Sequence, residues 1–222
     1  MKKLQNRLSN LVGIRMGIWG FSLLCSLASV QAHPTIFKGG FVFDNLNQSD
    51  KNEAAAHYSI LPTLSLGVHG LRQNLDGKNL YSVTSYTGLL LKRWNEKNFL
   101  ANTYIYGGVG FARYQQKSKP AFYAGAQADI ENRQWLLMGK FETMQFKKFE
   151  DLYTYMGRLG FAPYQANYEE LQGWMILEYD FQPFRQKAHE VSAIARFFYR
   201  SFLIEAGSSF RGDLKLNLMF HY

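Results

Sequence analysis

Three side chains near residue 57 have the types that a serine hydrolase uses. His57 and Ser59 lie two residues apart, and Glu53 precedes them. A serine, an imidazole base and a carboxylate can cleave esters when they share one surface, and an alternating strand would point His57 and Ser59 to the same side. No nucleophile-elbow motif surrounds the serine. We therefore predict no catalytic residue, and an outer-membrane lipid-modifying enzyme stays as an alternative.

Metal and cofactor motifs are not found either. None of the five histidines has the spacing of a zinc site. His57 and His69 have the same parity, but twelve residues of one strand would separate them by roughly 40 Å. The glycine-rich stretch 106–111 lacks the lysine and the helix of a phosphate loop, so it indicates strand curvature or close packing. We expect no metal and no cofactor.

The first 32 residues have the pattern of a secretory signal. Basic residues precede an apolar run from Gly17 to Val30, and Val30 and Ala32 are the small residues of a cleavage site. We expect a signal peptide over residues 1–32, export through the Sec pathway and a mature domain over residues 33–222. An uncleaved anchor helix is the alternative, but the run is short and ends at this cleavage site.

Removal of this segment halves the apparent basicity. The chain has 25 basic and 17 acidic residues, a net charge of +8. The segment contains four basic residues and no acid, so 21 basic residues face 17 acids afterwards, a net charge of +4. The charge is therefore no evidence for nucleic-acid binding, and we expect no nucleic-acid partner. The only cysteine, Cys25, lies in the same segment, so the mature domain has no disulfide.

The rest of the chain consists of alternating apolar and polar residues in segments of about ten, separated by turn residues. Aromatic residues make up 16% of the chain, which suits strands, and no apolar run reaches the roughly 20 residues of a transmembrane helix. The pattern predicts eleven strands: 36–44, 57–69, 79–93, 98–114, 120–131, 134–146, 152–163, 170–181, 189–199, 201–209 and 213–222. A change of phase near residues 199–202 predicts a tight hairpin.

One side of these strands carries sparse charges that nearly alternate in sign from strand to strand. Antiparallel neighbours would pair such charges across the sheet, as an enclosed interior requires. We predict a charge network inside the barrel: Asp129, Lys140, Glu142, Arg158, Glu178, Asp180, Arg196, Glu205 and Lys215. A periplasmic soluble barrel with an apolar ligand is a second alternative, and it would reverse the facing: Leu64, Leu66, Leu216 and Leu218 inward, Lys140 and Glu178 in water.

The other side is apolar, with aromatic residues near strand ends. Two aromatic girdles flank the lipid-facing band of a membrane barrel, and only helices and closed barrels satisfy every backbone group in lipid. Because helices are excluded by the pattern, the fold class is all-β: a closed antiparallel transmembrane β-barrel. The aromatic residues are Phe122, Trp135, Tyr153, Tyr179, Phe181, Tyr199, Phe220 and Tyr222.

The cleaved signal, the alternating strands and a final strand with an aromatic end resemble bacterial outer-membrane β-barrel proteins. The residues of the final strand that carry the resemblance are Leu214, Leu216, Leu218, Phe220 and Tyr222. The resemblance implies a location in the outer membrane of a Gram-negative bacterium and contact with outer-membrane lipid and lipopolysaccharide. It also implies recognition of the final strand by the barrel-assembly machinery. Members usually end in Phe, whereas this sequence ends in Tyr222.

The strand number and the function are inferred from general properties of membrane barrels. Single-chain bacterial barrels have an even number of strands, so the chain should have ten or twelve. A barrel of this size is narrow, and its own side chains should partly plug it. We expect a narrow pore, or a structural or surface barrel, without catalysis.

Overall fold

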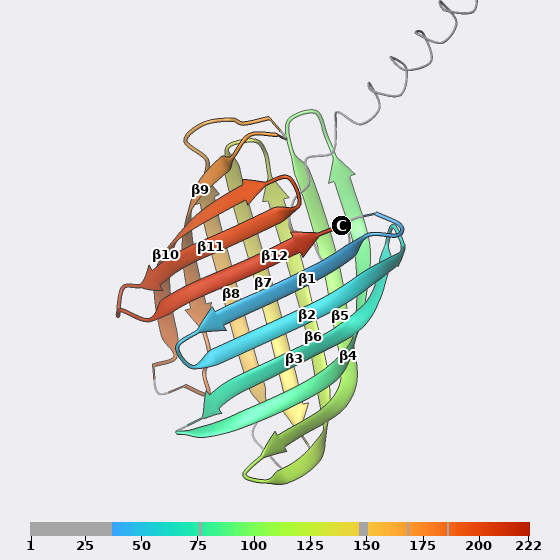
Figure 1. Ribbon diagram of the computed structural model, residues 1–222, viewed down its shortest axis with the longest axis vertical. Helices are drawn as coiled ribbons and strands as arrows, with labels where there is room; N and C mark the ends of the chain where they lie inside the picture. The colour runs from blue at the N-terminus through green and yellow to red at the C-terminus, as the bar shows by residue number, and fades with distance from the viewer. Residues whose placement is uncertain (1–36, 76, 147–150, 168, 186) are drawn as a thin grey trace, which may run out of the picture. The chain divides into compact units, whose positions relative to one another are not determined.

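The structure is a computed structural model that describes residues 37–75, 77–146, 151–167, 169–185 and 187–222. Twelve strands form a closed antiparallel barrel, in which β1, drawn blue, lies beside β12, drawn red (Figure 1). The prediction of a closed antiparallel barrel is confirmed, and twelve is the correct strand number. The expected signal peptide over residues 1–32 lies outside the described residues.

The strands follow one another around the barrel in chain order. Their bounds are β1 (Phe41–Gln48), β2 (Lys51–Leu61), β3 (Leu64–Leu75), β4 (Lys78–Asn95), β5 (Leu100–Tyr114), β6 (Lys117–Glu131), β7 (Trp135–Phe146), β8 (Leu152–Phe161), β9 (Gln172–Phe181), β10 (His189–Tyr199), β11 (Phe202–Ser209) and β12 (Leu214–His221).

The barrel closes where the first strand meets the last. Val42 of β1 lies opposite His221 of β12, and Gln48 lies opposite Lys215 at the other end of the same pairing. Closure gives the first and the last strand a partner on both sides, so neither β1 nor β12 presents an open edge.

Two of the expected strands are misplaced, whereas the others agree with the structure to within about three residues. The expected single strand 57–69 is wrong: β2 ends at Leu61 and β3 begins at Leu64. A register shift between Ser59 and Leu61, a β-bulge beside the two-residue turn, keeps the alternation in phase through the turn and hides it. The first expected strand, 36–44, begins too early, because β1 runs over residues 41–48 and β2 begins at Lys51.

The change of phase near residue 200 was predicted correctly. β10 ends at Tyr199 and β11 begins at Phe202. Between them Arg200 has a φ of 53°, in the left-handed region that two-residue hairpins use. Here the connection reverses the parity of the apolar residues, which made the hairpin visible in the sequence.

The apolar side chains face outward. Phe111 is 68% exposed and Leu177 is 48% exposed, whereas the neighbouring Glu178 is 2% exposed. A soluble barrel would require the reverse, with Leu66 and Leu216 inward and Glu178 in water, so this alternative is wrong. Within the described ranges, no helix is long and apolar enough to cross a membrane.

The glycine-rich stretch of β5 allows two strands to approach closely. A Cβ atom at Gly108 would lie 1.7 Å from the carbonyl oxygen of Ser85, and one at Gly110 would lie 2.0 Å from that of Val83. Only glycine fits beside β4 at these positions. The prediction of close packing for residues 106–111 is confirmed.

Part of the interior is apolar, which the sequence analysis did not predict. Buried apolar and aromatic residues from β3 to β8 pack together inside the barrel. The interior is therefore not lined by polar side chains alone. The cluster comprises Leu71, Leu80, Tyr86, Tyr106, Ala112, Ala121, Tyr123, Met144, Phe146 and Leu152.

The outward facing of β9 can be tested with a charge. We expect Leu177→Arg to lower the free energy of unfolding by about 2–4 kcal/mol in lipid vesicles, because the arginine must enter hydrocarbon. Urea titration in vesicles measures this change. Gln134→Arg, in the exposed turn between β6 and β7, should change it by less than about 0.5 kcal/mol. Equal effects of the two variants would show that Leu177 does not face lipid.

Candidate functional site

All nine charged residues predicted for the interior point into the barrel. Glu178 and Glu205 are each 2% exposed, and Arg158 is 9% exposed. Lys140 and Arg196 are half-buried. The structure brings six of the nine into one network, pairs Lys140 with Glu142, and places Asp129 with other partners. A role of these residues in conduction stays a prediction.

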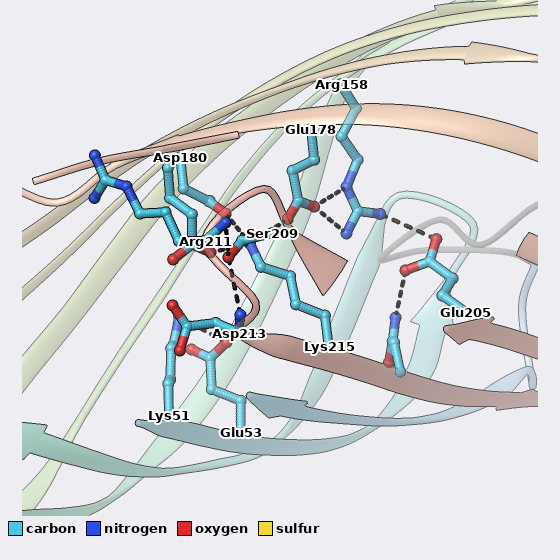
Figure 2. A network of polar contacts seen from close by, with 12 residues as sticks. Lys51, Glu53, Arg158, Glu178, Asp180, Glu205, Ser209, Arg211, Asp213 and Lys215 are labelled. Carbon is cyan, nitrogen blue, oxygen red and sulfur yellow. Dashed lines mark hydrogen bonds and ion pairs between the residues drawn. The ribbon is translucent and has the colours of Figure 1, made fainter. Parts of the chain in front are cut away.

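Two arginines and two glutamates form the centre of the network, and Figure 2 shows Arg158 between Glu178 and Glu205. Arg158 of β8 lies directly opposite Glu178 of β9, and its Nε is 2.6 Å from Glu178 Oε2. Another nitrogen of the same guanidinium lies 3.1 Å from Glu205 Oε1. Arg196 of β10 binds the same oxygen of Glu205 at 2.6 Å. One carboxylate thus joins two arginines, and Asn217 donates to its other oxygen at 3.2 Å.

Lys215 of β12 extends the network by contacting three carboxylates. Its Nζ lies 2.8 Å from Glu178, 2.6 Å from Asp180 and 2.8 Å from Glu190. Asp180 and Glu190 face each other across β9 and β10, so their like charges would repel without the lysine. Gly207 lies opposite Lys215 on β11, and a Cβ atom there would lie 2.3 Å from the carbonyl oxygen of Ala193 on β10.

We call these seven residues the ionic cluster: Arg158, Glu178, Asp180, Glu190, Arg196, Glu205 and Lys215. The sequence analysis placed Glu190 in the expected strand 189–199 but did not include it among the interior charges. Arg185 lies 3.8 Å from Glu190 and also pairs with Asp50. The cluster therefore links five strands, β8 to β12, with the connections beside them.

Lys140 and Glu142 lie on β7, away from the ionic cluster. Lys140 Nζ is 2.8 Å from Glu142 Oε1. The hydroxyls of Tyr123 and Tyr106 donate to the same oxygen at 2.5 Å and 3.2 Å. Three donors thus satisfy one buried carboxylate, which is 7% exposed, and this offsets part of the cost of removing its charge from water.

Five aromatic rings form a continuous stack inside the barrel. His57 stacks on Tyr86 at a centroid distance of 4.9 Å, and Tyr86 lies 5.9 Å from Tyr106. Tyr106 lies 5.8 Å from Tyr123, which stacks on His69 at 4.4 Å. The two histidines come from β2 and β3 and the three tyrosines from β4, β5 and β6. We call these rings the ring stack.

A cavity of about 120 Å³ lies beside the ring stack. Its wall includes Glu53, which pairs with Lys51 at 2.9 Å and with His69 Nε2 at 3.4 Å. We call it the inner cavity, and its lining is Asp44, Glu53, Ala55, His69, Tyr86, Tyr106, Tyr123, Gln127, Lys140, Glu142 and Met219.

Asp129 belongs to a separate group on β4, β5 and β6. Asn102 donates to Asp129 at 2.8 Å, and Arg93 donates to Asn102 at 2.7 Å. Gln127 donates to the second oxygen of Asp129 at 3.2 Å. The predicted network is thus not continuous around the barrel.

The hydrolase residues do not form a site that lipid can enter. Ser59 is fully buried inside the barrel, and its Oγ has no hydrogen-bond partner. Glu53 is bound by Lys51 and His69. A nucleophile that lipid must reach from outside the barrel would have to face outward, so the geometry does not support ester hydrolysis at Ser59.

The estimated separation of His57 and His69 is wrong. Because a turn lies between β2 and β3, Gly67 is opposite His57 and His69 is opposite Ala55. The two histidines are therefore diagonal neighbours on adjacent strands. Among the described residues, no group of three or more His, Cys, Asp or Glu side chains is arranged to hold a metal ion.

The residues predicted as an assembly signal follow the alternation of β12. Leu216 and Leu218 are each 41% exposed on the outer face, and Leu214 is exposed beside them. Phe220 contacts Phe202 of β11 at a centroid distance of 4.9 Å, and Tyr222 is exposed. Their recognition by an assembly factor stays a prediction.

No family model matches the chain, and no curated protein matches it. A structure of KdgM porin is similar over 82% of this chain and 98% of that chain, with 12% identity and a TM-score of 0.45. KdgM porin in complex with disordered oligogalacturonate has 11% identity, the same coverage and a TM-score of 0.46. The β domain of the Bordetella autotransporter BrkA has 11% identity, covers 82% and 96%, and has a TM-score of 0.38.

The ionic cluster should hold β8 to β12 together. We expect Arg158→Met to lower the free energy of unfolding by about 3–5 kcal/mol, because it leaves Glu178 and Glu205 buried with fewer partners. Arg211→Met, in the exposed turn after β11, is the matched control and should change stability by less than about 0.5 kcal/mol. Urea unfolding in vesicles measures both, and a comparable loss for both arginines would contradict this role.

Gly125 should be required by the ring stack. A Cβ atom there would lie 2.4 Å from Tyr106 Cε2, whereas one at Gly139 would have no atom within 4 Å. We expect Gly125→Ala to cost about 1–3 kcal/mol through overpacking and Gly139→Ala to be neutral or slightly stabilising. Thermal unfolding of the two variants checks the difference, which should vanish if Tyr106 can move away freely.

Proposed function

We propose that the chain is an integral outer-membrane β-barrel that provides a narrow passage constricted by its own ion pairs. The observation that carries this proposal is the opposite chemistry of the two faces: apolar side chains cover the outside, and charged side chains line much of the inside. In a barrel that crosses a membrane, the inner face is the only one on which water and ions can travel. Rings of charge set the selectivity of such passages.

The constriction would lie at the ionic cluster. Its side chains project from β8, β9, β10, β11 and β12 and bind each other at 2.6–3.1 Å. Paired charges can exchange partners with a passing ion, which an apolar plug cannot do. The proposed passage is therefore narrow and of low conductance.

A closed structural barrel is the second candidate. The apolar cluster from β3 to β8 fills part of the interior, and the inner cavity measures about 120 Å³. A barrel in which such packing persists would serve as a membrane anchor or surface protein and would not conduct ions.

We also propose that outer-membrane lipid surrounds the barrel and that β12 is the strand presented for assembly. The exposed leucines of β12, Leu214, Leu216 and Leu218, support both points because their outward side remains apolar along the strand. Crosslinking at Leu216 during membrane insertion would test the second point.

Ion conductance distinguishes the two candidate functions. We expect the purified protein to give small conductance steps in planar bilayers. Arg158→Ala combined with Arg196→Ala should enlarge the steps and shift the preference toward cations, because the constriction loses two positive charges while its carboxylates remain. Unchanged conductance and ion preference would favour the closed structural barrel.

Two further variants control for an effect of misfolding on the measured conductance. Arg196→Gln alone removes only the less buried of the two arginines and should give a smaller change in the same direction. Arg133→Ala, in the exposed turn between β6 and β7, should leave conductance unchanged. Each variant is used only if its folded form migrates differently from its heated form on a gel.

A further inference from the structure

The inner cavity contains one carboxylate that has no ionic partner among the residues that the structure describes. Glu53 is paired with Lys51, and Glu142 is paired with Lys140. Asp44 of β1 also lines the cavity, and its Oδ1 is buried with no hydrogen-bond partner. A buried carboxylate is costly unless a cation or a donor compensates it. One additional cation in the cavity would compensate this carboxylate.

Strand register explains why space remains next to this carboxylate. Asp44 of β1 lies opposite Ala55 of β2, and Ala55 lies opposite His69 of β3. The three residues thus form one row across three strands, with the smallest side chain in the middle. The methyl group of Ala55 leaves the space between the carboxylate and the imidazole open, and all three residues line the cavity.

The imidazole adds a second acceptor to the same space. His69 is 4% exposed, and its Nε2 faces Glu53 Oε1 at 3.4 Å. A carboxylate only accepts hydrogen bonds, so Nε2 carries the proton in a neutral ring and Nδ1 is an acceptor. This Nδ1 is buried without a partner. The row therefore offers two acceptors without a partner among the described residues, Asp44 Oδ1 and His69 Nδ1.

We propose that the inner cavity binds one small primary ammonium ion, with Asp44 as its counter-ion and His69 Nδ1 as a second acceptor. An ammonium group has three N–H donors and one positive charge, which match the two acceptors and the missing charge. Metal ions fit less well, since no described group of three or more His, Cys, Asp or Glu side chains can hold one. A cavity of about 120 Å³ accepts only a few non-hydrogen atoms.

The site does not depend on conduction, and it rests on the proposed function only in that a solute must reach the barrel interior. Binding is therefore measured on the folded full chain in detergent micelles, with no bilayer. Titration calorimetry with ethylammonium chloride should show one saturable site per barrel. Tetramethylammonium chloride and sodium chloride at equal ionic strength should give no such site, because neither cation has N–H donors.

Three variants test whether the ammonium ion binds between Asp44 and His69. Asp44→Asn should weaken ethylammonium binding by about tenfold or more, the loss expected for one hydrogen bond to a charged group. Ala55→Leu should abolish binding by filling the space without changing any charge. Ala54→Leu is the matched control: its side chain points to the other face of β2 by alternation, and binding should be retained.

The outcomes separate this site from the proposed passage. Equal binding of sodium or tetramethylammonium would overturn the ammonium site, and so would unchanged ethylammonium binding in Asp44→Asn. The absence of any saturable binding would also overturn it, and Asp44 would then be a protonated carboxyl group. A barrel that binds ethylammonium at Asp44 but never conducts would retain the site and refute only the passage.

Discussion

A strand surrounded by hydrocarbon must place every backbone N–H and C=O group in a hydrogen bond with a neighbouring strand, because no water is present to replace a missing partner. This constraint determines the rest of the structure. It requires β1 to pair with β12, so that the sheet has no edge. Once the sheet is closed, alternation sends every second side chain toward lipid and every other one into a confined interior. The chemistry of the two faces then has to differ.

The interior meets this requirement by matching charges. Each acid of the ionic cluster touches at least one arginine or lysine, and Lys215 compensates three carboxylates at once. Buried ion pairs add little net stability compared with apolar packing, but breaking one of them is costly. Such a cluster therefore selects a single strand register: a slip by one residue would turn Glu178 or Arg158 into lipid.

Small residues decide which large side chains fit inside. Gly125 lies under the ring of Tyr106, and Ala55 separates Asp44 from His69. The two positions have different effects. The ring of Tyr106 occupies the space beside Gly125 and belongs to the ring stack, whereas the space beside Ala55 is part of the inner cavity. The ionic cluster thus lies where the interior is tightly paired, and the proposed ammonium site lies where one charge remains uncompensated.

The sequence by itself determined the barrel, its sidedness and which charges face inward, because a strand has a two-residue period and apolar residues must meet lipid. It also located the hairpin at Arg200, where the turn changes the phase. It could not reveal the turn between β2 and β3, because a β-bulge beside the turn preserves the phase, and so it misplaced His57 and His69 relative to each other. Only the tertiary structure decided the partners of each charge, the apolar cluster inside β3–β8, the ring stack and the uncompensated Asp44. These depend on strand stagger and on contacts across the barrel between residues far apart in the chain, and no local pattern records those distances.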